Sequence, residues 1–259
     1  MSAKAADAAA LAAIGAATRE LHLPTVRAEA VRLAETAQRS RLSHLGYLAE
    51  VLAAEVDERA ERRRTRRIRE ARFPRIKRLG DFDLAAAPTV DPAAMAAVAS
   101  CAFVERGDPL VLLGDSGTGK THLLVGTGIA ACEQGRWVRY VTAAQLVNEL
   151  AEAADERRLS RVVARYGRVE LLCLDEWGYV RLDARGSELL FQILTEREER
   201  ASVAVASNLP FSEWGQIIPD PRLVAAVVDR LTFRAEIIET GTESYRLRTS
   251  RASRPKKTA

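Results

Sequence analysis

The stretch that decides the fold is Gly114-Asp115-Ser116-Gly117-Thr118-Gly119-Lys120-Thr121. It matches the phosphate-binding loop pattern G-x-x-x-x-G-K-[ST] at every fixed position. An apolar run from Pro109 to Leu113 precedes it, and a segment compatible with a helix follows from Gly119 to about Gln134. These flanks supply the strand and the helix that the motif requires. The sequence therefore predicts an α/β domain whose parallel sheet carries a phosphate site at the end of one strand.

Each kind of residue in this loop suits a nucleotide. Glycines let the backbone approach closely enough for successive N–H groups to point at phosphate oxygens, and the following helix offers its positive end. Lys120 is expected to reach the β- and γ-phosphates, and Thr121 to hold Mg²⁺ through its hydroxyl. The alternative is a glycine turn that binds nothing. The predicted cofactors are ATP and Mg²⁺, and the predicted nucleotide-binding residues are Gly114, Asp115, Ser116, Gly117, Thr118, Gly119, Lys120, Thr121 and His122.

Composition limits the class of protein. With 259 residues, 47% of them hydrophobic, the chain is long enough for one large α/β domain and a smaller appendage. No uncharged run reaches the roughly 18 residues of a membrane span, and the alanine-rich N-terminus lacks the features of a signal peptide. Cys101, Cys132 and Cys173 form neither a C-x-x-C pair nor an even disulfide set. We expect a soluble, cytoplasmic protein with no membrane partner.

Most of the positive charge lies in one segment near the end of a predicted N-terminal helical region. Between Arg59 and Arg78, eleven Lys and Arg residues accompany two Glu, a local charge of +9 (eleven minus two) in a chain of net charge +4. Arginine at this density suits the phosphate backbone of duplex DNA, bound without regard to sequence. The alternative is a solvated helix face. The predicted DNA-binding residues are Arg62, Arg63, Arg64, Arg66, Arg67, Arg69, Arg72, Arg75 and Lys77.

Domain limits follow from where this helix stops. The residue before Pro74 avoids helical geometry, so the basic helix should end near Arg72. A linker-like stretch from Leu79 to Asp91 follows, in which Phe82 belongs either to the core or against a nucleotide base. We predict a small all-α domain over 1–78, a nucleotide-binding domain over 79–250 and a disordered basic tail over 251–259.

A second motif lies downstream of the loop. The apolar run from Val169 to Leu174 predicts a strand buried on both faces, and it delivers Asp175 and Glu176 at its carboxyl end, where parallel sheets bind ligands. An acid in this place is the Walker B feature: Asp175 is expected to orient Mg²⁺, and Glu176 to polarise the attacking water. After the next strand, Asn208 is expected beside the γ-phosphate; otherwise it is a turn residue.

Several segments together resemble one family, the IstB-type ATPases, which are transposition helpers encoded by insertion sequences. The resemblance spans roughly residues 18–250 and implies an AAA+ P-loop NTPase domain of the initiator and helicase-loader branch. It also implies ATP-driven assembly of copies on double-stranded DNA and cooperation with a partner transposase. The segments that carry it are GDSGTGKT at 114–121, LLCLDEWGY at 171–179, SNLPFSEWG at 207–215, DRL at 229–231, ESYRLR at 243–248, RFPR at 72–75 and DFD at 81–83.

The family pattern also assigns roles to single residues. It carries ATP binding onto Gly114–Thr121, magnesium and water activation onto Asp175 and Glu176, and sensing onto Asn208. Arg230 matches a candidate arginine finger that acts across a subunit interface, although a salt bridge capping its helix is the alternative. Arg246 is a candidate second sensor. The family usually shows Asp-Asp-Leu where this chain has Asp175-Glu176-Trp177, which restores the usual AAA+ acid pair.

Three functions compete. The first is a Mg²⁺-dependent ATPase, stimulated by DNA and by self-assembly, that assists or regulates a transposase on target DNA. The second is a replicative helicase loader, which shares the same motifs. The third is an ATP-gated DNA-binding switch that does not hydrolyse ATP, and the intact Asp175-Glu176 pair disfavours it.

Overall fold

The computed structural model describes residues 3–245. The chain divides into two compact units, Met1–Arg66 and Arg67–Ala259, which we call the N-terminal unit and the C-terminal unit. The predicted domain limits at 78/79 and 250/251 therefore stay predictions. The predicted tail at 251–259 and the second-sensor candidate Arg246 lie outside the described residues.

The N-terminal unit is helical. It contains α1 (Ala3–Glu20), α2 (Pro24–Arg39) and the greater part of α3 (His44–Ala71). Proline occupies the first position of α2, where its missing N–H costs no hydrogen bond. The carboxylate of Glu55 in α3 accepts hydrogen bonds from the backbone N–H groups of Thr25 (2.8 Å) and Val26 (3.0 Å). A side chain of α3 thus satisfies the amides at the start of α2, which no intrahelical acceptor can do.

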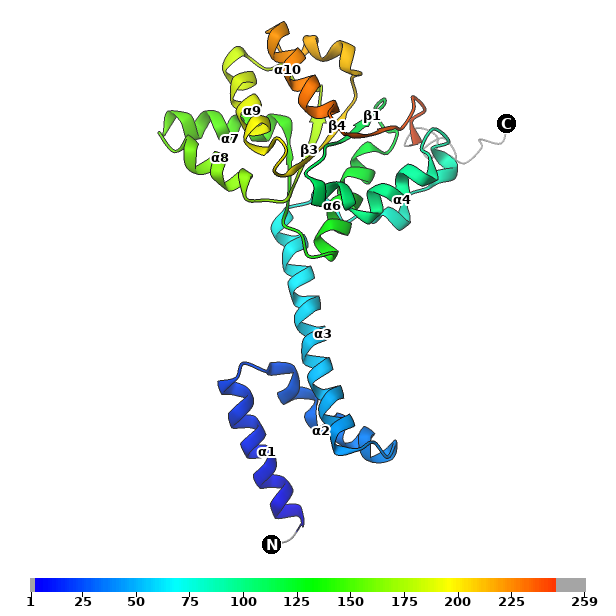
Figure 1. Ribbon diagram of the computed structural model, residues 1–259, viewed down its shortest axis with the longest axis vertical. Coiled ribbons are helices and arrows are strands. Elements are labelled where there is room, and N and C mark those ends of the chain that lie inside the picture. The colour runs from blue at the N-terminus through cyan, green and yellow to red at the C-terminus, as the bar shows by residue number, and fades with distance from the viewer. Residues whose placement is uncertain (1–2, 246–259) are drawn as a thin grey trace, which may run out of the picture. The chain divides into compact units, whose positions relative to one another are not determined.

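The C-terminal unit is built on a five-stranded parallel sheet in the order β2-β3-β4-β1-β5 (Figure 1). Apolar residues make up most of β1, β3 and β4, as expected for strands covered on both faces. Along each strand, alternate residues point to opposite faces and so enter two separate clusters of buried side chains. The strands are β1 (Leu110–Leu113), β2 (Val138–Thr142), β3 (Leu171–Trp177), β4 (Ser202–Ser207) and β5 (Glu236–Glu239).

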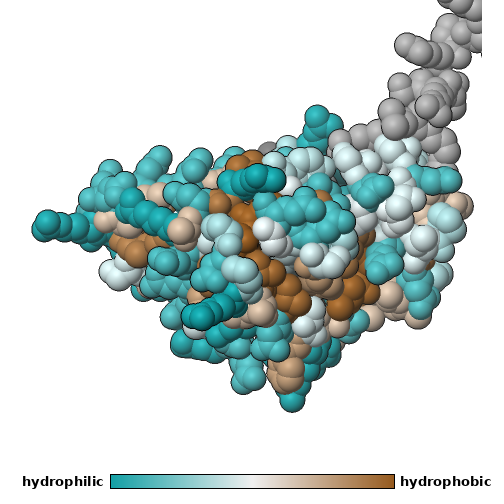
Figure 2. All heavy atoms as spheres, turned by 90° about the horizontal axis from the view of Figure 1, so that it is seen from above, coloured by the Kyte–Doolittle hydropathy of each residue, from teal (hydrophilic) through white to brown (hydrophobic). Residues whose placement is uncertain are grey.

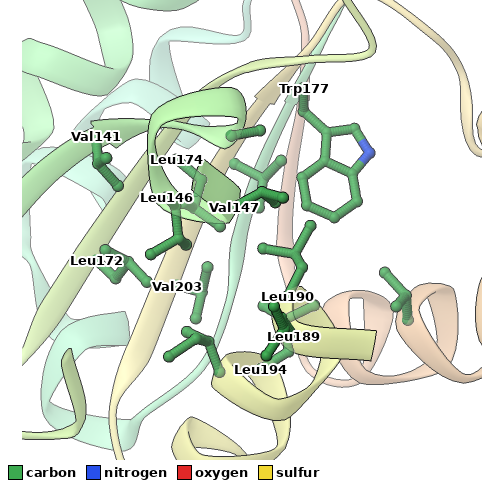
Figure 3. Close-up of a cluster of buried hydrophobic side chains, with 14 of the residues drawn as sticks. Val141, Leu146, Val147, Leu172, Leu174, Trp177, Leu189, Leu190, Leu194 and Val203 are labelled. Carbon is green, nitrogen blue, oxygen red and sulfur yellow. The ribbon is translucent and has the colours of Figure 1, made fainter. Parts of the chain in front are cut away.

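Helices cover both faces of this sheet. On one face, Leu172, Leu174 and Val203 of the strands meet Leu190 and Leu194 of a single helix, α9 (Figure 3). That face packs against α7 (Ala143–Asp155), α8 (Leu159–Gly167), α9 (Ala184–Arg197) and α10 (Pro221–Thr232). The opposite face packs against α4 (Pro92–Ser100), α5 (Ala102–Arg106) and α6 (Lys120–Glu133). Short 3-10 turns lie at Leu79–Asp81, Leu84–Ala86 and Phe211–Gln216.

The predicted fold class is confirmed: a parallel sheet lies between two layers of helices, and a helical region precedes it. From the sequence alone, Asp91 as the cap and Pro92 at the first helical position predict one helix to about Glu105, and the structure differs. The segment after Asp91-Pro92 is two helices, because Cys101 adopts a left-handed conformation (φ 56°) between α4 and α5. The turn brings Phe103 and Val104 into the core beneath the sheet.

The surface is mixed in polarity. On the face shown in Figure 2, hydrophobic residues gather near the centre and hydrophilic residues lie around them. Large exposed hydrophobic side chains of the C-terminal unit include Tyr179, Val180 and Phe233. Among the described helices, none combines the length and the apolar character that crossing a bilayer requires.

Candidate nucleotide site

The loop between β1 and α6 has the backbone that its glycines permit. Gly114, Gly117 and Gly119 have φ of 146°, 87° and 105°, values that residues with a Cβ rarely adopt. A Cβ added at Gly119 would lie 2.7 Å from the ring of Phe82. Packing as well as conformation therefore requires glycine at the position that begins the helix.

The start of α6 is open to an anion. Its N-cap residue, Gly119, offers no side chain to the first amides of the helix, whereas Thr142, Asp183 and Asp220 cap α7, α9 and α10. The Lys120 ammonium is largely buried and donates to the Asp115 carbonyl oxygen (2.7 Å), so a cation lies over the loop. Amides without a side-chain cap and a positive charge together form the environment that phosphate oxygens require.

The chain that follows β5 closes the outer side of the loop. Thr240 Oγ1 lies 2.6 Å from Thr118 Oγ1, and Asp115 N donates to the Gly241 carbonyl oxygen (3.0 Å). Farther on, Tyr245 N donates to the Gly117 carbonyl oxygen (3.0 Å). These contacts hold the loop against the chain after β5.

The acid pair lies at the carboxyl end of β3. Asp175 is buried; its Oδ2 accepts a hydrogen bond from the Tyr140 hydroxyl (2.7 Å) and its Oδ1 accepts one from Glu176 N (2.8 Å). Burial and the neighbouring Asp175 carboxylate raise the pKa of Tyr140, so this hydroxyl stays a donor. Sequence reasoning missed Tyr140, because only the pairing of β2 with β3, which sets Thr142 opposite Asp175, reveals its partner.

Glu176 has a different environment from Asp175. It is exposed, and its φ of 59° lies in the left-handed region that non-glycine residues seldom occupy. The register between β3 and β4 shifts between Leu174 and Trp177, so Glu176 lies in an irregularity of the strand. Such irregularities re-aim a side chain. Here the carboxylate is placed outside the paired strand, where water can reach it.

Asn208 completes the carboxyl edge. It follows Ser207, which is in register with Leu113 before the loop and with Trp177 after the acids. Its Oδ1 is buried and has no hydrogen-bond partner within the described part of the chain. A buried amide oxygen without a hydrogen-bond partner costs free energy, and a ligand or water that donates to it would remove that cost.

His122, in the first turn of α6, contacts the chain before β1. Its Nε2 lies 2.9 Å from the Arg78 carbonyl oxygen, and its ring meets the edge of Phe82 at a centroid distance of 5.4 Å. Phe82 is half-buried and packs against the cluster beneath α6. Phe82 is therefore part of the packing around the loop, which agrees with its interpretation as a core residue.

Arg230 lies away from this edge. It is near the end of α10, before β5 begins, and therefore at the amino ends of the strands. Its Nε lies 2.9 Å from Glu198, and its guanidinium stacks 4.5 Å from the Phe191 ring centroid. The salt bridge expected as the alternative role is thus present. A cavity of about 390 Å³ opens beside it, with a charged lining of Arg106, Asp108, Arg197, Glu198, Glu199, Asp229, Arg230 and Arg234.

The predicted DNA-binding residues fall on both sides of the unit boundary. In the N-terminal unit, Arg62, Arg63, Arg64 and Arg66 are exposed on α3. Arg62 pairs with Glu58 (2.9 Å) and Arg64 with Glu61 (3.4 Å). Exposed pairs of this kind contribute roughly 0–1 kcal/mol, so they leave both arginines available to another anion.

The remaining predicted DNA-binding residues belong to the C-terminal unit. Arg69, Arg72, Arg75 and Lys77 are exposed. Arg67 is half-buried, and its guanidinium lies 5.3 Å from the centroid of the Trp137 ring. Among the predicted DNA-binding residues, Arg67 is therefore the least accessible to DNA.

The residues at the carboxyl ends of the strands suit magnesium and a nucleoside triphosphate. Thr121 and Asp175 supply a hydroxyl and a carboxylate, the hard oxygen ligands that Mg²⁺ prefers. Lys120 and the open amides of α6 supply positive charge for phosphates. Asn208 supplies a buried polar oxygen that has no hydrogen-bond partner among residues 3–245. The site therefore fits the predicted cofactors.

Comparison with known proteins agrees with this geometry. The family model described as IstB-like ATP binding protein, of the IS21 type, matches residues 16–253. The chain belongs to this family. The ATP-binding protein of insertion sequence IS5376 from Geobacillus stearothermophilus is 36% identical over 180 residues, which cover 70% of this chain and 72% of that relative. The corresponding protein of IS21 from Pseudomonas aeruginosa is 35% identical over 176 residues, 68% of this chain and 66% of its own length.

Solved structures share the fold of the C-terminal unit of this IstB-like protein. AMPPCP-bound DnaA from Aquifex aeolicus superposes with a TM-score of 0.54 at 22% identity, covering 65% of this chain and 51% of that one. DnaI superposes with a TM-score of 0.52 at 21% identity, covering 63% of this chain and 90% of that one. At such identities the likeness is one of fold.

Proposed function

We propose that this IstB-like protein binds and hydrolyses ATP with Mg²⁺, assembles on duplex DNA and assists a partner transposase. The observation that carries the proposal is the acid pair. Asp175 is buried and held by Tyr140, while Glu176 is exposed with a strained backbone, at the same sheet edge as the phosphate loop. Two adjacent acids with such different environments suit two roles, metal binding and water activation.

In this proposal each residue has one task. The amides from Gly114 to Thr121 and the Lys120 ammonium hold the phosphates, and Thr121 and Asp175 hold the metal. When bound, Mg²⁺ supplies positive charge that offsets the charge developing on the transferred phosphoryl group. Glu176 accepts a hydrogen bond from the attacking water and orients it. Asn208 contacts the terminal phosphate or the water through its side-chain amide.

Arg230 acts in this scheme from a neighbouring copy. Its place at the amino edge of the sheet puts it beyond reach of the loop in its own chain. An arginine that serves a neighbour's nucleotide makes turnover depend on assembly, because each site is incomplete in a lone protomer. The salt bridge to Glu198 holds the guanidinium in place until that contact forms.

Duplex DNA and a transposase are the partners that the remaining evidence favours. The exposed arginines of α3 and of the segment after it supply phosphate contacts. The relatives are named as proteins of insertion sequences, elements whose movement a transposase performs. Homo-oligomer formation follows from the trans role of Arg230.

The deciding experiment measures ATP turnover by the full chain with and without duplex DNA, and capture of the chain by the transposase of its own insertion sequence or by a replicative helicase. We expect DNA-stimulated turnover and capture by the transposase. Capture by the helicase alone would favour the loader function. ATP binding without turnover under every condition would favour the non-hydrolysing switch.

A second measurement tests Arg230. Turnover per protomer should rise with protein concentration, and Arg230→Ala should remove most of that rise. Arg200→Ala is the matched control, because Arg200 is exposed in the turn after α9 and its ion pair among the described residues is with Glu196 of that helix (3.4 Å). Turnover that is independent of concentration and unchanged in Arg230→Ala would contradict the trans role.

A further inference from the structure

The segment that joins α3 to the rest of the C-terminal unit lies along the helix of the phosphate loop. We call residues 72–82 the strap. Gly119, His122 and Gly126 are spaced three and four residues apart, so they share one face at the start of α6. Phe82 contacts this face at Gly119 and Leu79 contacts it at Gly126. Between these two contacts along α6, the Arg78 carbonyl oxygen lies 2.9 Å from His122 Nε2.

Glycine makes this contact possible. A Cβ at Gly126 would lie 2.8 Å from Leu79 Cδ2 and 3.0 Å from the Leu79 backbone nitrogen. One at Gly128 would lie 2.6 Å from the Phe73 ring. Glycine inside a helix is less favourable than alanine, so α6 gives up helix propensity at these two positions. In exchange, the strap approaches the helix backbone directly.

The strap also reaches the acid pair. The Phe73 ring lies 6.2 Å from the Tyr140 ring, and the Tyr140 hydroxyl donates to Asp175 (2.7 Å). The strap is therefore in contact with the phosphate loop at one end, through Phe82, and with the support of the metal-binding carboxylate at the other, through Phe73. Both halves of the nucleotide site rest on the same eleven-residue segment.

The same segment carries part of the predicted DNA contact. Arg72, Arg75 and Lys77 are exposed on it, while Phe73, Leu79 and Phe82 are turned into the packing against α6. The segment thus carries apolar side chains that pack against α6 and basic side chains that are exposed to solvent. A polyanion held by the basic residues would pull on the segment that supports the loop.

We propose that the strap couples DNA to the nucleotide site, with Leu79 and Phe82 as the residues that position the phosphate loop. This inference rests on the function proposed above. Phosphate contacts at Arg72, Arg75 and Lys77 favour one position of the strap on α6. That position in turn favours the conformation of the phosphate loop that binds ATP. By linkage, ATP then raises the affinity for DNA by the same factor that DNA raises the affinity for ATP.

The test measures that factor in the full-length chain. The affinity for a non-hydrolysable ATP analogue is measured with and without duplex DNA, and DNA affinity with and without the same analogue, in the wild type, in Gly126→Ala and in Phe82→Leu. We expect the wild type to show equal factors, of about 5 to 150, and both variants to fall within about two-fold of no coupling. Each variant is compared with itself, with and without DNA, so a lower ATP affinity in the absence of DNA does not count as uncoupling.

The control is Gly80→Ala. Gly80 lies in the strap, but nothing stands within 4 Å of an added Cβ, so coupling should persist. The melting temperature separates structural damage from uncoupling, and Phe82→Leu, which keeps an apolar side chain, guards against a Gly126→Ala chain that fails to fold. Wild-type coupling retained in both variants would overturn the inference. No coupling in the wild type, with ATP and DNA still bound, would mean that the proposed DNA-responsive function itself fails.

Discussion

The two units of this chain are stabilised in different ways. In the C-terminal unit, leucines of the central strands such as Leu110, Leu112 and Leu172 are completely buried between two layers of helices. In the described part of the N-terminal unit, the buried hydrophobic residues are Val26, Ala30, Ala37 and Val51, three of them in α2. On α3, by contrast, Leu45 is 78% exposed and Val56 61% exposed.

This difference agrees with the proposed function. A nucleotide site needs side chains held to within a fraction of an ångström, and a core buried on both faces of a sheet provides that rigidity. Contact with a phosphate backbone needs charge on an accessible surface more than it needs a core. The N-terminal unit accordingly has long helices, exposed arginines and few buried side chains. Substitutions in the two units should therefore have different effects, on ATP turnover, on DNA binding, on global stability or on the contact between α2 and α3.

The largest effect concerns chemistry in the C-terminal unit alone. Lys120→Ala should abolish measurable ATP binding, because it removes the cation over the loop. Glu176→Gln should keep ATP affinity while lowering turnover by about 10²- to 10⁴-fold, because it removes only the group that activates water. ATP affinity and turnover are measured separately, and DNA affinity without nucleotide is the control that should not change. Equal loss of ATP affinity in both variants would contradict the role of Glu176.

The positions of these residues in the fold were predictable because each follows from a local pattern. The loop sequence fixes the glycines and Lys120, and the apolar run before Asp175 fixes a strand end. Asn208 was placed correctly at the end of β4 for the same reason. Parallel strands bring such ends to one edge regardless of loop details.

Other features depend on neighbours that are distant in sequence. The support of Asp175 by Tyr140 requires the pairing of β2 with β3, and no local signal marks that tyrosine. The break at Cys101 was missed because cysteine, unlike glycine, does not signal a left-handed turn. The position of Arg230 at the far edge, with Glu198 as its partner, came only with the packing of α10 on α9.

The next effect concerns the exposed arginines of the N-terminal unit. Replacing Arg62, Arg63, Arg64 and Arg66 with alanine should lower the steepness of log affinity against log salt by up to about 3.6, at about 0.9 for each DNA phosphate that is no longer neutralised. Affinity should fall equally on unrelated DNA sequences, and ATP affinity should be unchanged. DNA binding is measured by titration at several salt concentrations.

The matched control for this variant lies in the same unit. Arg27, Arg32, Arg39 and Arg41 are exposed and lie outside the basic segment, so their replacement changes the net charge by the same amount. A patch variant with wild-type affinity and salt slope would show that α3 contributes a solvated surface. An equal effect of both quadruple variants would show that only total charge matters.

A smaller effect compares one leucine in each unit. Leu172→Ala in β3 should destabilise the chain by about 2–5 kcal/mol, because Leu172 is completely buried and leaves a cavity. Leu48→Ala in α3 should cost within about 0.5 kcal/mol, because that side chain is 50% exposed. Denaturant unfolding measures both. A large cost for Leu48→Ala that grows with protein concentration would show that assembly covers the exposed leucines.

The smallest effect isolates the Glu55 junction in the N-terminal unit. Burial favours a raised pKa for Glu55, but the backbone N–H of Val26, the Arg59 guanidinium and the backbone N–H of Thr25 outweigh it, and the pKa is lowered. A carboxyl whose folded pKa is lowered contributes stability above its unfolded value of about 4.3, and this is lost as the pH falls through the folded pKa. Glu55→Gln should therefore cost about 1–3 kcal/mol near neutral pH, the value of hydrogen bonds to a charged group, and less in acid.

Hydrogen exchange at the amides of Thr25 and Val26 measures this loss where it occurs, since both donate to the Glu55 carboxylate. Opening of the first turn of α2 should become easier in Glu55→Gln, while amides in β3 and β4 keep their protection, because the C-terminal unit does not depend on this carboxylate. Glu50→Gln is the control: Glu50 is exposed on the same helix and changes the charge equally. Faster exchange in both variants would assign the effect to net charge on α3, and faster exchange throughout the sheet would show that the two units unfold together.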